Sequence, residues 1–325
     1  MSKVTVFEVK NLVKQFGQKI VLDGVSFKVE KGDIFGVIGM SGSGKTTLLN
    51  TMIGFLDPDE GEVFYRPIRA LDNTTESLKL VHKNKHEVET VFGFASQDPS
   101  FYLQLTIIEN LRHFGSLYGM SKKILNSNIE KLLKLTGLED AKKTIARSLS
   151  GGMQKRLDIA CALVHSPQVL ILDEPTADLD PILRKQMWEL IRQINERGTT
   201  ILLSSHFLSE LEGLCTKIAI LHNGKILEVG SPNELKYLYS KNEEINLETA
   251  PGRYKKIIEK LKKSSDVKID KVIDKGHKII IYTPKSEQAL HRILHIMEQM
   301  NEKLLDVRVN KPSLNEIFES LVEND

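Results

Sequence analysis

Cysteine is scarce in this chain of 325 residues, because only Cys161 and Cys215 are present and they lie far apart. Two distant cysteines form neither a disulfide framework nor the paired spacing of a zinc site, which is typical of a reducing compartment. Long apolar runs are lacking too, since none approaches the roughly 18 residues of a membrane span. No basic-then-apolar leader opens the chain. We therefore expect any role at a membrane to depend on another chain that crosses it.

An excess of charge of either sign is also missing. The chain has 45 Lys and Arg against 43 Asp and Glu, for a net charge of +2, and the two signs are interspersed. This pattern is typical of a solvated surface and lacks the basic stripe of a nucleic-acid-binding protein. The hydrophobic content of 41% is ordinary for a soluble globular protein. The length predicts two domains, or one large domain with an appendage.

The most informative segment that is present is GMSGSGKT, from Gly39 to Thr46. It fits G-x-x-x-x-G-K-[ST], the pattern of a phosphate-binding P-loop. The apolar residues 34–38 before it predict a buried strand, and residues 46–53 after it predict the start of a helix. This strand–loop–helix context is what the motif requires, so we interpret the segment as a phosphate-binding loop rather than an ordinary turn.

The residue types of this loop suit a phosphate chain. Glycines permit backbone turns that a Cβ would forbid, so backbone N–H groups can wrap the phosphates, and the helix adds the positive end of its dipole. Lys45 supplies a charge to the β- and γ-phosphates, and the Thr46 hydroxyl can ligate Mg²⁺. The residues expected to bind the nucleotide here are Gly39, Met40, Ser41, Gly42, Ser43, Gly44, Lys45, Thr46 and Thr47.

Two carboxylates end a second apolar strand, VLILDE, at residues 169–174. If this strand lies beside the P-loop strand, Asp173 is placed near Mg²⁺ and Glu174 faces the attacking water. A carboxylate in that position can orient or deprotonate water, while phosphoryl transfer otherwise depends on positioning and charge neutralisation. Such a strand end alone could simply face solvent. Together with the P-loop it predicts nucleotide hydrolysis.

A third segment, LSGGMQ at residues 149–154, places Ser150, Gly151 and Gly152 at the start of a helical run. The bare backbone of a helix N-terminus is an anion-binding site. By itself the segment is better explained as a serine N-cap on an ordinary helix.

Together these segments resemble the ATPase subunits of ABC membrane transporters. LSGGM resembles the ABC signature, usually LSGGQ, with Met153 in place of the glutamine. The resemblance implies that Ser150, Gly151 and Gly152 contact the γ-phosphate of an ATP molecule held by another subunit. Other matching positions, in family order, are Phe16 for the aromatic residue that stacks on adenine, Gln97 for the Q-loop glutamine, 177–180 with Asp180 for the D-loop, and His206 for the switch histidine. Tyrosine is more usual than phenylalanine at position 16.

The resemblance implies a fold, an activity and partners. The fold is an α/β P-loop NTPase, with a RecA-like core and antiparallel β and α-helical subdomains, over residues 1–238. The activity is ATP hydrolysis, with Glu174, His206 and Gln97 as catalytic residues and Thr46, Gln97 and Asp173 as contacts of Mg²⁺. A head-to-tail homodimer would close on ATP and drive a separate transmembrane permease. The protein would then be cytoplasmic, held on the inner face of the cell membrane through that permease.

Residues 239–325 follow a polar break and form the second expected domain. Their pattern predicts strand, helix, two strands, helix and strand, then a terminal helix from Ser313, which indicates a small α+β ferredoxin-like unit. The segment 311–318 resembles the tail of drug- and antibiotic-exporter ATPases, which implies export. The alternative is a generic dimerisation or regulatory appendage. Upstream, residues 66–89 are polar, and we expect a loop-rich insertion with some helix.

Two other classes of protein contain P-loops but fit these residues less well. A non-transport ABC ATPase acting on nucleic acid or ribosomes is disfavoured, because the P-loop and signature are close together, only one signature is present and no basic stripe exists. A generic P-loop kinase leaves the signature and His206 unexplained. His291 and His295 lie four apart on an expected helix, but without a third ligand we expect a solvated face. Phe101 and Tyr102 fit either a permease groove or simple packing.

Overall fold

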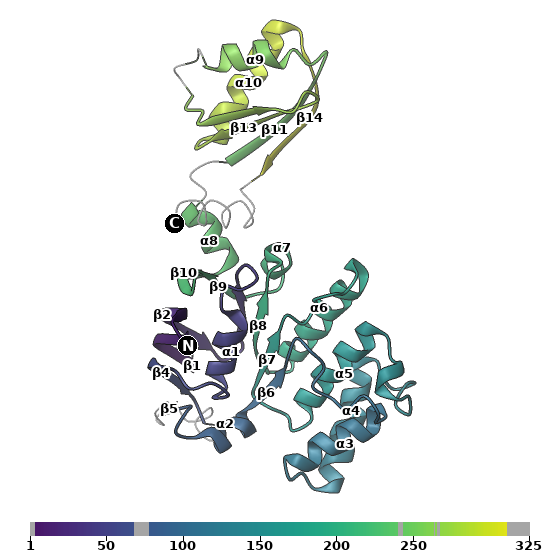
Figure 1. Ribbon diagram of the computed structural model, residues 1–325. Helices are drawn as coiled ribbons and strands as arrows, with labels where there is room; N and C mark the ends of the chain where they lie inside the picture. The colour runs from purple at the N-terminus through teal and green to yellow at the C-terminus, as the bar shows by residue number, and fades with distance from the viewer. Residues whose placement is uncertain (1–3, 68–77, 240–242, 263, 265–266, 311–325) are drawn as a thin grey trace. The chain divides into compact units, whose positions relative to one another are not determined.

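The computed structural model describes residues 4–67, 78–239, 243–262, 264 and 267–310. The chain divides into two compact units, Met1–Ser231 and Pro232–Asp325, which are described separately (Figure 1). The boundary predicted from the sequence, between residues 238 and 239, falls at the end of helix α8 (Pro232–Tyr239), which groups with the second unit. In the described ranges, every helix is too short or too polar to cross a bilayer.

A six-stranded sheet forms the centre of the first unit, in the order β10-β9-β3-β8-β7-β6. Its strands are β3 (Ile34–Ile38), β6 (Phe92–Ala95), β7 (Val169–Asp173), β8 (Thr200–Ser205), β9 (Lys217–His222) and β10 (Lys225–Gly230). All neighbours are parallel except the β9–β10 hairpin. Every residue of β3, β7 and β8 is buried, as expected for strands covered on both faces. Their carboxyl ends meet at one edge, where α/β sheets place ligands.

Helices flank this sheet, and three of them form a separate group. The helices of the first unit are α1 (Lys45–Met52), α2 (Lys85–Val91), α3 (Ile107–Leu117), α4 (Lys122–Thr136), α5 (Gly151–Leu163), α6 (Pro181–Glu196) and α7 (Leu208–Glu212). Figure 1 shows α3, α4 and α5 packed together beside the sheet. Thr106 and Glu109 start α3 with a capping box, and Gly137, at a φ of 66°, ends α4. The helical periodicity of residues 107–117, 122–135 and 151–164 predicts α3, α4 and α5 with bounds within a residue of those observed.

The start of the chain forms most of a second, antiparallel sheet, in the strand order β2-β1-β4-β5. Its strands are β1 (Thr5–Phe16), β2 (Lys19–Glu30), β4 (Glu60–Tyr65) and β5 (Lys79–Leu80). The alternating polar and apolar residues 4–29 predict antiparallel strands with turns at Gly17 and Gly24; the turn at Gly17 is present, but the one at Gly24 is wrong. Gly24 lies inside β2 with a φ of 70°, at a shift in the register of β1 and β2. A positive φ in a strand marks a bulge as readily as a turn, and a glycine alone does not distinguish them.

The expected insertion contains β5 and α2, while residues 68–77 lie outside the described part of the chain. The antiparallel sheet joins the core through stacked aromatic rings, with the centroids of Phe7 and Phe92 4.5 Å apart. Both side chains are buried, in a cluster that draws residues from both sheets. This packing holds the antiparallel sheet against the central sheet, whose strand β3 leads into the P-loop.

The second unit contains strands and helices in the predicted βαββαβ order. They are β11 (Glu243–Ala250), α9 (Tyr254–Lys262), β12 (Lys271–Asp274), β13 (Ile279–Thr283), α10 (Ser286–Met300) and β14 (Lys303–Asn310). The antiparallel sheet has the order β12-β13-β11-β14, and apolar residues such as Leu247, Ile257 and Ile293 form the core. The ferredoxin-like class of this unit remains a prediction. The helix expected from Ser313 and the exporter-like tail at 311–318 lie outside the described residues.

Candidate nucleotide site

The P-loop joins β3 to α1 and is built so tightly that glycine is required. A Cβ added at Gly39 would lie 2.4 Å from the Ser43 Oγ and 2.4 Å from the carbonyl oxygen of Leu221. Gly44 is the N-cap of α1 and has a φ of 104°, a conformation that residues with a side chain rarely adopt. The loop is therefore a close backbone turn at a helix start.

The polar atoms of this loop fit a phosphate chain. The Ser43 side chain is buried, and its Oγ has no hydrogen-bond partner among the described residues. The Lys45 ammonium is also buried and donates to the carbonyl oxygens of Gly39, at 2.9 Å, and Met40, at 3.1 Å. A buried hydroxyl without a partner is costly, and a phosphate oxygen at the helix start would supply the missing acceptor.

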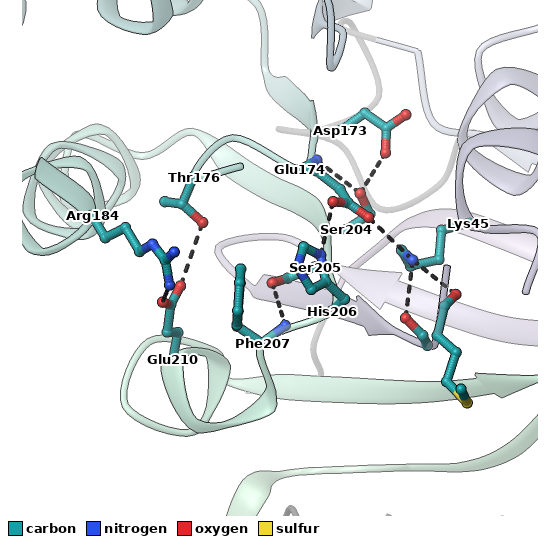
Figure 2. Close-up of polar contacts among 12 residues, drawn as sticks. Lys45, Asp173, Glu174, Thr176, Arg184, Ser204, Ser205, His206, Phe207 and Glu210 are labelled. Carbon is teal, nitrogen blue, oxygen red and sulfur yellow. Dashed lines mark hydrogen bonds and ion pairs between the residues drawn. The ribbon is translucent and has the colours of Figure 1, made fainter. Parts of the chain in front are cut away.

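Lys45, Glu174 and His206 form a connected cluster at the edge of the sheet (Figure 2). The Lys45 Nζ lies 3.2 Å from the Glu174 Oε1, and the His206 Nδ1 lies 2.9 Å from the Glu174 Oε2. Glu174 has a φ of 48°, so the backbone takes a left-handed turn where β7 ends. The carboxylate thereby stands between a P-loop cation and the imidazole that follows β8.

Asp173 and Glu174 are further tied together by Ser204, a residue the sequence did not single out as part of the site. The Ser204 hydroxyl donates to the Asp173 Oδ1 at 2.5 Å and accepts from the Glu174 N–H at 2.9 Å (Figure 2). The parallel register of β7 and β8 pairs Asp173 with Ser204 directly. Asp173 is 2% exposed, so its carboxylate is held in a defined place. The only sequence signal was the position of Ser204 at a strand end.

The other predicted nucleotide residues lie at the surface. Thr46 is exposed and Thr47 is half-buried at the start of α1. Phe16 is half exposed, with the Lys14 Nζ 5.6 Å from its ring centroid. Gln97 is exposed, and its backbone carbonyl accepts a hydrogen bond from Lys155. The structure thus gathers Lys45, Asp173, Glu174 and His206, whereas the described contacts of Phe16 and Gln97 lie elsewhere.

The signature and the D-loop meet each other instead. Ser150 is the N-cap of α5 and accepts from the Met153 N–H at 3.4 Å. Asp180 caps α6 by accepting from the N–H groups of Ile182 and Leu183. A Cβ at Gly152 would lie 3.2 Å from Leu183, so the two helix starts pack closely. A cavity of about 100 Å³ is lined by Gly151 and by residues 177–179. Ser150, Gly151 and Asp180 are exposed.

Helix α5 also holds the segment that follows Gln97. The buried Asp158 carboxylate accepts from the Ser100 hydroxyl at 2.5 Å and from the Ser100 N–H at 3.1 Å. Burial raises the pKa of Asp158 above its usual value, although the two hydrogen bonds from Ser100 act in the opposite direction. The sequence does not reveal this contact, because Asp158 resembles any helical residue until its burial is known.

Metal binding by protein side chains alone finds no support in the described ranges, where no group of three or more His, Cys, Asp or Glu residues could hold an ion. His291 and His295 are both exposed on α10. The two aromatic residues after the Q-loop differ from each other. Phe101 is buried, whereas Tyr102 is 53% exposed and contacts the ring of His113 edge-on.

The fold and the site define a P-loop nucleotide-binding protein with a second helix start suited to an anion. A profile of the ABC transporter family matches residues 22–177. The Nod factor export ATP-binding protein I of Burkholderia lata is 38% identical over 232 residues, covering 71% of this chain and 73% of that protein. The linearmycin resistance ATP-binding protein LnrL of Bacillus subtilis is 29% identical over 314 residues, covering 97% of each chain.

A solved ATP-binding cassette of an ABC transporter, in its ADP conformation, is 30% identical with a TM-score of 0.61. It covers 71% of this chain and 92% of that chain. The chain therefore belongs to the ABC transporter family, as an ATP-binding subunit with the ATPase activity of that family. The family and the P-loop α/β fold predicted from the sequence are confirmed. A generic P-loop kinase is excluded.

Proposed function

We propose that this chain powers an exporter, as a homodimer beneath a separate transmembrane permease. The observation that carries the proposal is the Lys45–Glu174–His206 cluster, which couples a phosphate-binding loop to a water-activating carboxylate. Export is supported by relatives whose names include Nod factor export and linearmycin resistance. The second of these matches 97% of the chain, so the likeness extends over the second unit.

In the proposed mechanism each residue of the cluster has a separate task. The Lys45 ammonium neutralises the β- and γ-phosphates of ATP, and Glu174 orients or deprotonates the attacking water. His206 contacts the γ-phosphate and holds the Glu174 carboxylate through its Nδ1. Mg²⁺ would neutralise phosphate charge when bound, and Thr46, Gln97 and Asp173 would hold it. Phe16, with half of its surface exposed, is available to stack on adenine.

The dimer in this proposal is head to tail, with a composite site. Ser150, Gly151 and Asp180 are exposed and lie together at the starts of α5 and α6. The backbone N–H groups at the start of α5 form an anion-binding surface that a second copy can present to the γ-phosphate, whereas the Asp180 carboxylate already accepts from the N–H groups at the start of α6. ATP between the copies would then favour the closed dimer by mass action, and hydrolysis would release it.

The permease partner follows from the family, whose members are parts of transporter complexes with membrane components. We place the ATPase on the cytoplasmic face of the membrane, where ATP is available. Tyr102 is an exposed aromatic residue after the Q-loop and suits an interface, whereas the buried Phe101 serves packing. The near-neutral charge of the chain supports a protein partner over nucleic acid or ribosomes.

The experiment that tests the proposal combines purification with transport. The chain is expressed with a membrane protein encoded beside it, and the complex is reconstituted in vesicles. We expect the two to co-purify and to transport substrate only with ATP and Mg²⁺. A Glu174→Gln complex should assemble but not transport. Co-purification with ribosomes or nucleic acid, without any membrane protein, would support the non-transport ABC ATPase instead.

A further inference from the structure

We propose that Arg184 is a positioning residue for the switch His206, and that it couples His206 to the D-loop (residues 177–180). This inference rests on the proposed role of His206 in hydrolysis. Arg184 lies in the first turn of α6, where its N–H donates to the Asp180 carbonyl oxygen at 2.9 Å. Neither the motifs nor the family positions named above include Arg184.

The guanidinium of Arg184 bridges the D-loop and α7, as Figure 2 shows in part. Its Nε donates to the Leu179 carbonyl oxygen at 2.7 Å, and its Nη1 donates to the Glu210 Oε1 at 3.1 Å. The side chains of Arg184 and Glu210 are 26% and 18% exposed, so water screens the pair less than it would a surface pair. The guanidinium is planar and rigid, and its Nε and Nη1 donate to two different partners, so its orientation is fixed.

The same guanidinium contacts the residue that follows His206. Its central carbon lies 4.3 Å from the centroid of the Phe207 ring, within the range of a cation–π contact. The Phe207 ring in turn lies 3.9 Å from the His206 ring, tilted by 41°. Because the positions are consecutive, a turn of the Phe207 side chain changes the surface against which the imidazole rests.

His206 has few other restraints. Its side chain is 40% exposed, and the hydrogen bond that the structure records for its ring goes to Glu174. Glu210 is anchored a second time, because the Thr176 hydroxyl donates to its Oε2 at 3.4 Å. Arg184, Glu210 and Phe207 thus form a cluster of contacting side chains next to the imidazole. Because Arg184 is hydrogen-bonded to the Leu179 carbonyl oxygen, a shift of that carbonyl would move this cluster and, with it, the ring of His206.

The test compares Arg184→Ala and Arg184→Lys with the wild-type chain, in the form that hydrolyses ATP. Arg184 has no described contact with the P-loop, so the Kd for ATP should change less than twofold. The kcat of Arg184→Ala should fall roughly ten- to a hundredfold, as expected when a catalytic group is displaced by about an ångström. Arg184→Lys retains the positive charge beside Glu210 but lacks the planar set of guanidinium donors. Its kcat should therefore lie between those of the wild type and Arg184→Ala. Lys185→Ala, an exposed cation one residue along, is the matched control and should leave kcat unchanged.

A double substitution distinguishes positioning from general stability. If Arg184 acts only through His206, adding Arg184→Ala to His206→Ala should lower kcat less than twofold further. If the kcat losses of the two single substitutions multiply in the double variant, the proposal is overturned. It is also overturned if Arg184→Ala weakens ATP binding by as large a factor as it lowers kcat. Phe207→Leu tests the same contact without touching a charge and should reproduce the fall in kcat even if Arg184→Ala does not fold. A folded Phe207→Leu protein with wild-type kcat would contradict the proposal.

The outcomes also separate this inference from the proposed function. If Lys45→Ala hydrolyses ATP like the wild type, the assignment of the site itself is wrong. If Lys45→Ala is inactive and His206→Ala retains only a small, measurable kcat while Arg184→Ala is fully active with unchanged Kd, the proposed function stands and the role of Arg184 fails.

Discussion

The Lys45 ammonium and the Glu174 carboxylate form an ion pair, with the Lys45 Nζ 3.2 Å from the Glu174 Oε1. Their side chains are only 5% and 13% exposed. The two groups expected to serve ATP therefore neutralise each other. A phosphate that binds Lys45 competes with this carboxylate, whose other oxygen, Oε2, lies 2.9 Å from the His206 Nδ1. Binding of ATP would thus release the base toward the water that it activates.

Removal of the Lys45 charge should weaken nucleotide binding. A charge-assisted phosphate contact is worth roughly 1.5–3 kcal/mol, so Lys45→Ala should lower ATP affinity about tenfold or more and largely abolish turnover. Equilibrium binding of a fluorescent ATP analogue and a phosphate-release assay measure the two effects. Lys31→Ala, an exposed lysine at the turn between β2 and β3, is a suitable control. Wild-type hydrolysis by a folded Lys45→Ala protein would refute the site.

Glu174→Gln separates binding from hydrolysis. The amide cannot act as a base, and it no longer competes as an anion for Lys45. We expect ATP affinity at least equal to that of the wild type, with hydrolysis nearly abolished. The protein should then accumulate as an ATP-dependent dimer in size-exclusion chromatography. Adding Ser150→Ala should reduce dimerisation, because the proposed role of Ser150 is to contact the partner's ATP. A saturated Glu174→Gln protein that stays monomeric with and without the permease would count against the head-to-tail dimer.

Asp158 makes stability depend on pH in a direction that can be checked. Its pKa is raised by burial, so above the usual range of an aspartate the folded state binds more protons than the unfolded state. The contribution of Asp158 to stability therefore falls as pH rises through this window. Asp158→Asn keeps an oxygen to accept both Ser100 bonds and should be more stable than the wild type at pH 7, with the difference closing in acid. Asp158→Ala leaves both donors unpaired and should cost roughly 1–3 kcal/mol. Denaturant titrations at several pH values measure both.

His165 predicts the opposite pH dependence. Burial lowers its pKa from 6.5 to about 4, although a hydrogen bond from its Nε2 to the Phe92 carbonyl oxygen, at 3.1 Å, works the other way. Between those values the unfolded chain holds the extra proton, so stability should decline as pH falls from about 6.5 to 4. In His165→Gln the decline of the melting temperature over this range should be smaller. His291→Gln, an exposed position, should melt with the wild-type pH dependence.

The division into two units can be tested by truncation. The nucleotide motifs all precede Ser231, so a chain that ends at residue 231 or 239 should fold and bind ATP. The two lengths differ by α8, and comparison of their melting temperatures shows to which unit this helix belongs. Precipitation of both, under conditions in which the whole chain is soluble, would mean that the second unit is part of the core.

Many features of the fold and of the site could be predicted from local sequence patterns. The P-loop, the acidic end of β7 and the signature were each legible because their chemistry depends on neighbours within a few residues. The continuous apolar runs of β3 and β7 predicted buried strands for the same reason. The range of α3 followed from helical periodicity, whereas its capping box became evident only in the structure. Gly24 shows the limit, since a glycine signals a positive φ but not whether a turn or a bulge uses it.

Only the tertiary structure decided which side chains meet. Ser204 bridges Asp173 and Glu174 because β7 and β8 pair in one register, and Arg184 of α6 reaches the residue after His206 where it also pairs with Glu210 of α7. Asp158 became informative once its burial against Ser100 was known. These contacts join residues about 20 to 60 positions apart, where the local periodicity of helices and strands carries no information about spatial distance. The chemistry of the site could therefore be predicted from the chain, but the groups that orient it could not.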